Sequence, residues 1–76
     1  MLLDLSRNEL KTLPRSLGDL TQLKKLKLAT NKFERLPLHL SRLLGLEELL
    51  LGRNPLIDVP PALCTLPKLT LMQMDG

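Results

Sequence analysis

The segment from Leu23 to Gly45, LKKLKLATNKFERLPLHLSRLLG, sets the pattern of the whole chain. The same frame recurs on both sides of it at an interval of 23 residues, without insertion or deletion. Three of the columns that result are Asn8, Asn31 and Asn54, then Pro14, Pro37 and Pro60, then Leu17, Leu40 and Leu63. A fixed interval between about 20 and 50 residues is typical of proteins built from stacked repeats. The sequence therefore predicts a stack of short, similar coils.

The shared frame LxxLxLxxNxLxxLPxxLxxLxx resembles the leucine-rich repeat, whose pattern is L-x-x-L-x-L-x-x-N-x-L. The resemblance covers the entire chain. It implies an α/β fold in which the repeats form a right-handed solenoid with parallel strands on the concave face. We divide the chain into a partial repeat at residues 1–22, complete repeats at 23–45 and 46–68, and a partial repeat at 69–76. We expect a segment of a longer array, uncapped at both ends, because terminal repeats usually carry a polar outer face.

The hydrophobic period changes within each repeat, and the change predicts the local structure. Leu26-Lys27-Leu28 alternates apolar and polar residues, which indicates a short strand with its leucines pointing inward. Pro37 then turns the chain, because proline is tolerated in the first turn of a helix. Leu40 and Leu43 follow three residues apart, a spacing that suits a 3₁₀ turn. We expect 3₁₀ or irregular segments on the convex face.

The asparagine column has a structural interpretation. Where the chain leaves each strand, backbone N–H and C=O groups turn inward and need hydrogen-bond partners. An asparagine amide supplies both a donor and an acceptor, so it can bridge successive turns. We predict a structural ladder formed by Asn8, Asn31 and Asn54.

Composition excludes several function classes. Eleven basic and eight acidic residues give a net charge of +3, which is too small and too scattered to indicate nucleic acid as a partner. The one aromatic residue, Phe33, offers no platform for base stacking. No apolar run approaches the roughly 18 residues of a membrane span, and we expect no membrane binding. A single cysteine, Cys64, and the absence of a glycosylation motif favour an intracellular setting, with the cytoplasm as the expected compartment.

No group of residues indicates catalysis, a metal or a cofactor. His39 and Cys64 lie on adjacent repeats but in different columns, and no third group is aimed at either. Nucleophilic catalysis needs a base in hydrogen-bond contact and an orienting partner. One histidine and one cysteine also fall short of a metal-ligand set. We therefore predict a protein that is not an enzyme.

The outward positions of the strands form columns about 4.8 Å apart. Asp4, Lys27, Leu50 and Gln73 share one column, and Lys25 and Glu48 are neighbours in another. Such lateral charge pairs can simply keep a sheet soluble, since exposed pairs are worth little. Leu50, however, is an outward leucine among charges, which fits the apolar centre and polar rim of a protein interface.

Among leucine-rich repeats, this 23-residue form is similar to the intracellular repeats of Ras-suppressor and Scribble-type scaffold proteins of signalling. The resemblance implies a non-catalytic protein-interaction module that binds its partner on the concave face, with a small GTPase or a phosphatase subunit as the kind of partner. Carried over to this sequence, the contact positions are Asp4, Arg7, Lys25, Lys27, Thr30, Glu48, Leu50, Arg53 and Gln73. Two alternatives stay open. The repeats could be internal structural spacers of a larger scaffold, or the targeting arm of an enzyme encoded elsewhere in the parent chain.

Overall fold

The computed structural model of the chain describes residues 1–74, so the last two residues of the predicted fourth repeat lie outside the described residues. Its strands are β1 (Leu2–Asp4), β2 (Lys25–Lys27), β3 (Glu48–Leu50) and β4 (Leu71–Gln73). Its 3₁₀ helices are η1 (Arg15–Asp19), η2 (Leu38–Arg42) and η3 (Pro61–Thr65). Strands and 3₁₀ helices alternate along the chain, one of each in every complete repeat. The predicted architecture is confirmed.

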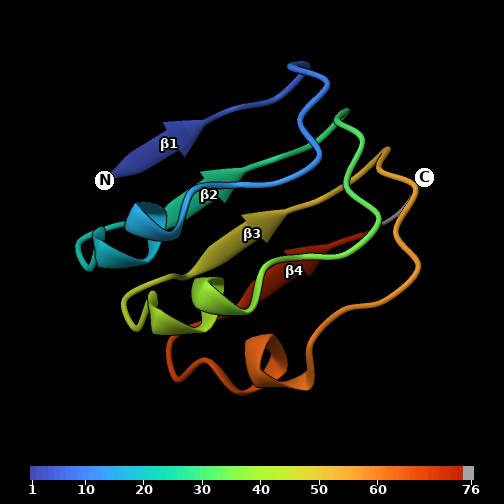
Figure 1. Cartoon of the computed structure of the whole chain (residues 1–76). Coiled ribbons are helices and arrows are strands. Elements are labelled where there is room, and N and C mark those ends of the chain that lie inside the picture. The colour runs from blue at the N-terminus through green and yellow to red at the C-terminus, as the bar shows by residue number, and fades with distance from the viewer. Residues whose placement is uncertain (75–76) are drawn as a thin grey trace.

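The four strands form one parallel sheet in the order β1-β2-β3-β4 (Figure 1). The 23-residue interval appears directly as the strand register. Leu3 pairs with Leu26, Leu26 with Leu49, and Leu49 with Met72. Each strand begins one residue before the alternating segment that predicted it, so β2 is Lys25–Lys27 rather than Leu26–Leu28. The ladder nevertheless continues past its end, because the N–H of Leu28 donates to the Leu50 carbonyl at 2.8 Å.

Each 3₁₀ helix begins directly after a proline of the repeat frame. Pro14 and Pro37 are extended, each with φ of −66°, and Pro60 has φ of −57°. Their carbonyls accept hydrogen bonds from the N–H groups three residues later, at Leu17, Leu40 and Leu63. The short i to i+3 bond defines a 3₁₀ helix, and a helix of five residues turns the chain back toward the sheet within one repeat.

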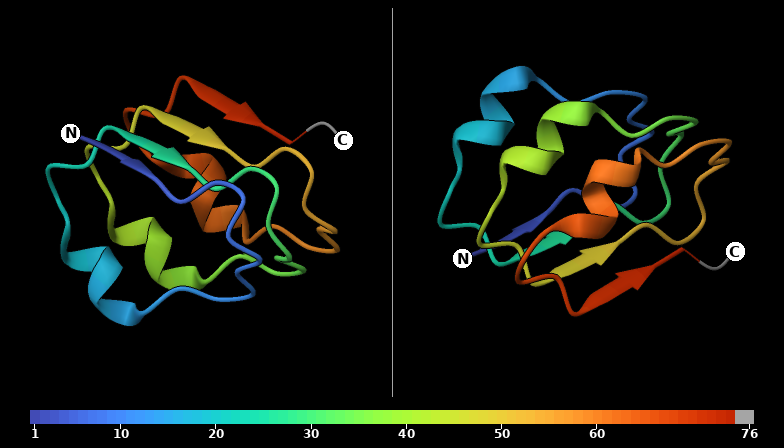
Figure 2. Two further views of the ribbon diagram at one scale, coloured as in Figure 1. Left: turned by 90° about the horizontal axis from the view of Figure 1, so that it is seen from above. Right: turned by 90° about the horizontal axis from the view of Figure 1, so that it is seen from below.

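The core lies between the sheet and the layer of 3₁₀ helices (Figure 2). It consists of leucines stacked in register around a single aromatic side chain, and Leu26, Phe33 and Leu49 are fully buried. Met72 is partly buried and packs against this core, as its column predicts. Leu17 and Leu66 belong to the outer repeats, yet each is only 7% exposed, because both side chains are part of the core between the two layers.

Candidate functional site

The sheet has one face against the core and one face turned away from the 3₁₀ helices, which we call the open face (Figure 2). Alternation along each strand places the residues on either side of the core leucine on this face. On the central strands these side chains are half-buried: Lys25, Lys27, Glu48 and Leu50. On the edge strands Asp4 and Gln73 are exposed, because an edge strand has a neighbour on one side only. The open face corresponds to the concave face expected from the sequence.

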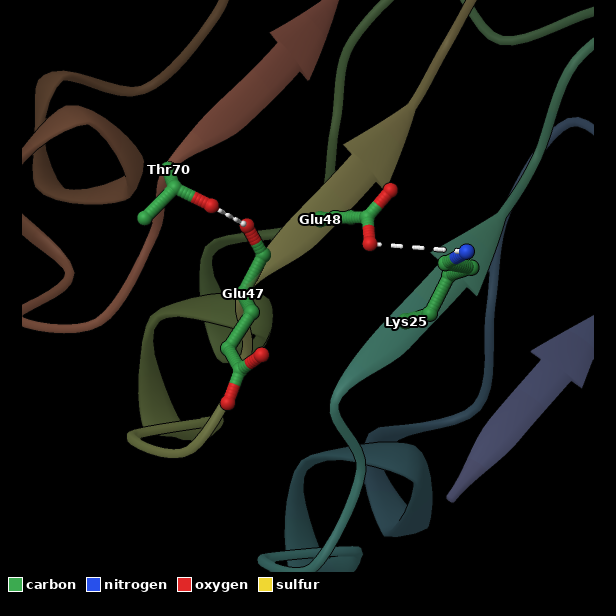
Figure 3. A network of polar contacts seen from close by, with 4 residues as sticks. All are labelled: Lys25, Glu47, Glu48 and Thr70. Carbon is green, nitrogen blue, oxygen red and sulfur yellow. Dashed lines mark hydrogen bonds and ion pairs between the residues drawn. The ribbon is translucent and has the colours of Figure 1, made fainter.

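Lys25 and Glu48 form an ion pair across the open face (Figure 3). Their strands pair in register, and Lys25 Nζ lies 3.4 Å from Glu48 Oε2. The next pair of repeats is joined by a hydrogen bond, in which the Thr70 hydroxyl donates to the backbone carbonyl of Glu47 at 3.1 Å. The ion pair is about one-third exposed at both side chains, so solvent screens it strongly. It contributes little stability and leaves the middle of the face close to neutral.

A recess of about 480 Å³ opens on this face at the ends of β1 and β2. Its lining residues are Asp4, Ser6, Arg7, Lys27, Ala29 and Thr30. Four of these were predicted as contact positions. Ser6 and Ala29 were not predicted as contact positions. Each directly follows the second inward leucine of its strand segment, Leu5 or Leu28. The other five predicted contact positions do not line the recess: Lys25, Glu48, Leu50, Arg53 and Gln73.

Asp4 is held in place within the recess. Its Oδ1 accepts a hydrogen bond of 3.0 Å from the backbone N–H of Ser6. That bond, followed by the Ser6 side chain and then by the positive charges of Lys27 and Arg7, lowers the pKa of Asp4. Both cations therefore lie close enough to Asp4 to act on it electrostatically.

Leu50 is on β3. It pairs with Lys27 of β2 on one side and with Gln73 of β4 on the other. It is half-buried, whereas the core residues that flank it, Leu49 and Leu51, are fully buried. The middle of the open face thus presents the aliphatic side chain of Leu50 between polar neighbours, as the sequence predicts. Two further leucines of the same face, Leu2 and Leu71, are exposed on the edge strands.

The residue before each asparagine has a left-handed backbone. Arg7, Thr30 and Arg53 have φ of 62°, 57° and 60°. An L-residue rarely adopts this conformation, and a β-branched threonine least readily. The conformation ends the strand, and the asparagine that follows donates to the backbone carbonyl three residues before it.

The asparagine side chains join neighbouring repeats. Asn31 is buried, and its Oδ1 accepts hydrogen bonds from the N–H groups of Asn8 and Leu10 in the preceding repeat. Its Nδ2 donates to carbonyls in both repeats, those of Leu5, Leu28 and Ala29. Asn54 repeats the pattern one coil later, with bonds to the Leu28 carbonyl and from the Phe33 N–H. Asn8 is exposed, and its Nδ2 bonds lie within its own repeat.

His39 and Cys64 lie away from the open face, on two of the 3₁₀ helices. His39 lies on η2, where its buried Nε2 has no hydrogen-bond partner among residues 1–74. Cys64 is exposed on η3. Within the described part of the chain, no cluster of three or more His, Cys, Asp or Glu side chains is placed to hold a metal ion. Over the same residues, no helix has the length and apolar character needed to cross a membrane.

The register of strands, the proline-initiated 3₁₀ helices and the asparagine bonds between coils define a solenoid of short parallel repeats. The family model described as Leucine Rich Repeat matches residues 1–20. This match and the parallel sheet with its 3₁₀ helices support a leucine-rich repeat solenoid. Repeats of this family are generally non-catalytic modules for protein–protein interaction. A search of curated proteins found no match to the chain.

Proposed function

We propose that the chain binds a partner protein through the open face of its sheet. The observation that carries the proposal is Leu50, a half-buried aliphatic side chain set on that face between Lys27 and Gln73. Protein interfaces combine an apolar centre that loses its water with a polar rim that remains solvated. A sheet built from consecutive parallel strands also holds these side chains at fixed spacing, which limits the entropy lost on binding.

The resemblance to intracellular scaffold repeats supports a more specific proposal. The partner would be a small GTPase or a phosphatase subunit, and the encounter would take place in the cytoplasm. Arg7, Lys27 and Arg53 make the strand ends of the open face basic, which favours an acidic surface on the partner.

A matched pair of triple variants tests the binding face. The first variant changes Lys27, Leu50 and Arg53 of the open face to alanine. The control also changes one lysine, one leucine and one arginine to alanine, at exposed positions outside the strands. These positions are Lys68, Leu38 and Arg15. Purified small GTPases, each in its GDP and GTP forms, and phosphatase subunits are then passed over the immobilised chain. We expect the first variant to lose binding and the control to retain it. Binding that survives the first variant and disappears in the control would refute the open face as the binding surface.

The spacer function is favoured by one observation. The Lys25–Glu48 ion pair satisfies two charges of the open face within the sheet itself, as expected of a surface that only has to stay soluble. If the repeats are spacers, binding by a longer chain that contains them is unchanged in both triple variants. The paired measurement therefore separates the two functions.

A further inference from the structure

We infer that the recess at the ends of β1 and β2 receives an acidic side chain of the partner protein, and that Leu50 contacts an aliphatic residue next to it. The inference rests on the proposed function and specifies the chemistry that the open face recognises. It commits to a glutamate or aspartate followed by an aliphatic residue.

Charge is the first argument. Arg7 and Lys27 both line the recess. Among residues 1–74 the ion pairs are Lys25–Glu48 and Arg42–Asp19, so neither of these two cations is engaged in one. Lys27 is half-buried, which reduces its hydration compared with a fully exposed lysine. A carboxylate entering the recess would meet a guanidinium and an ammonium group, the donors of strong charge-assisted hydrogen bonds.

Asp4 is the one carboxylate in the lining, and it sets the net charge of the recess. Its Oδ1 is occupied by the Ser6 N–H, so part of its charge is satisfied by the backbone. Two cations and one anion leave the recess with a net positive charge. Asp4 competes with an incoming carboxylate for the same two cations, which makes its removal a test with a predicted sign.

Shape is the second argument. Ala29 forms part of the lining and is small, and the Thr30 and Ser6 hydroxyls supply further donors. Lys27 and Leu50 are directly paired in register, so they lie about 4.8 Å apart in the direction of the sheet hydrogen bonds. Consecutive Cα atoms of a bound segment lie about 3.8 Å apart. A residue next to a carboxylate that is bound beside Lys27 is therefore within reach of Leu50, provided that the segment is not fully extended there.

Two other basic surfaces lack the half-buried lysine and the neighbouring Leu50, and the first of them provides a control with a similar charge. Lys11, Lys32 and Arg35 surround a hollow that also contains Glu34, and all four side chains are exposed. On the 3₁₀ layer, Arg42 is already paired with Asp19 at 3.0 Å.

The test uses two peptides that differ by one group, acetyl-Gly-Glu-Leu-Gly-amide and its glutamine counterpart. Each is titrated into the ¹⁵N-labelled 76-residue chain, and amide shifts are followed by NMR. We expect the glutamate peptide to shift the amides of Arg7, Lys27 and Thr30, with an affinity roughly fivefold higher than the glutamine peptide, as for a partly exposed ion pair. Equal affinities, or the absence of shifts at these amides, would overturn the inference.

Charge variants make the test specific. Arg7→Glu with Lys27→Glu should abolish the preference for glutamate and create one for the lysine peptide acetyl-Gly-Lys-Leu-Gly-amide. Asp4→Asn should strengthen binding of the glutamate peptide, since asparagine keeps an acceptor for the Ser6 N–H and removes the competing charge. Lys11→Glu with Arg35→Glu is the matched control and should leave the preference unchanged. A control that behaves like the recess variant would show that only the overall charge matters, and would refute the recess.

The two proposals fail separately. If the peptide preference is missing while the open-face triple variant still loses its protein partner, the acidic recess is wrong and the binding face stands. If the preference for the glutamate peptide is present while the open-face triple variant still binds its protein partner, the recess recognises carboxylates but is not the partner site.

Discussion

The Oδ1 atom of Asn31 lies 2.9 Å from the backbone nitrogen of Asn8, its counterpart 23 residues earlier, and accepts a hydrogen bond from it. One repeat is thereby attached to the next by the residue that occupies the same column in both. The Asn31 amide also donates to the Leu5 carbonyl of the earlier repeat at 3.0 Å. The asparagine column thus satisfies backbone groups that the end of the sheet leaves unpaired.

Replacing Asn31 by alanine should lower the free energy of unfolding by about 2–4 kcal/mol, because it leaves several inward-facing backbone groups without partners. Urea denaturation followed by circular dichroism measures the change. Asn8→Ala is the control: Asn8 is exposed and its side chain bonds within its own repeat, so the loss should stay below about 1 kcal/mol. Equal losses at the two positions would show that the bonds between repeats add nothing.

Replacing Thr30 by asparagine should raise the free energy of unfolding by about 1 kcal/mol, because Thr30 has φ of 57° and asparagine tolerates the left-handed conformation better than a β-branched residue. Thr12→Asn, at an exposed position outside the set of left-handed residues, should change stability little. The thermal midpoints of the two variants provide the comparison. A destabilised Thr30→Asn variant would mean that the threonine side chain makes contacts that outweigh the strain.

The repeat interval predicted the features that depend on spacing alone. A constant 23 residues between Leu26 and Leu49 requires their strands to pair in register, and the structure confirms this. The prolines likewise predicted where the 3₁₀ helices begin. Each of these features follows from a local preference that is repeated without interruption.

The recess on the open face could be predicted only in part. Asp4, Arg7, Lys27 and Thr30 were identified from their columns, whereas their gathering around one hollow depends on the left-handed turns that follow the strands. The frame contains no glycine or asparagine at Arg7 or Thr30 to indicate such a turn.

The carboxyl group of Asp4 should titrate below its ordinary pKa of 3.8 in the folded chain, because the Ser6 N–H, the Ser6 side chain and the nearby cations favour the charged form. The stability that this group contributes is fully present above the ordinary pKa and is lost as the pH falls through the lower folded value. Carbon-13 NMR of the carboxyl group measures the pKa directly.

The causes of this pKa shift can be separated by substitution. Ser6→Ala should raise the pKa of Asp4 part of the way, since the backbone N–H remains, and Lys27→Met should raise it by less. A native pKa at or above 3.8 would contradict the hydrogen-bonded carboxylate and would also remove the basis for treating Asp4 as a competitor in the recess.

Gly18 of η1 lies against the backbone of the neighbouring 3₁₀ helix, η2. A Cβ atom at this position would lie 2.9 Å from the backbone carbonyl oxygen of His39 on η2, and backbone cannot move aside as a flexible side chain can. Gly18→Ala should therefore lower the free energy of unfolding by about 1–3 kcal/mol. The sign is informative, because glycine to alanine at an unhindered position stabilises by about 0.4–1 kcal/mol through the unfolded chain.

Ser16→Ala is the matched control for Gly18→Ala, since Ser16 is exposed on the same 3₁₀ helix. It should change the free energy of unfolding by less than about 0.5 kcal/mol in urea denaturation. If Gly18→Ala proved neutral or stabilising, η1 and η2 would have to be further apart than the contact with His39 requires. The 3₁₀ layer would then tolerate larger side chains at its contacts, and the 23-residue stacking would depend on the sheet and the asparagine ladder alone.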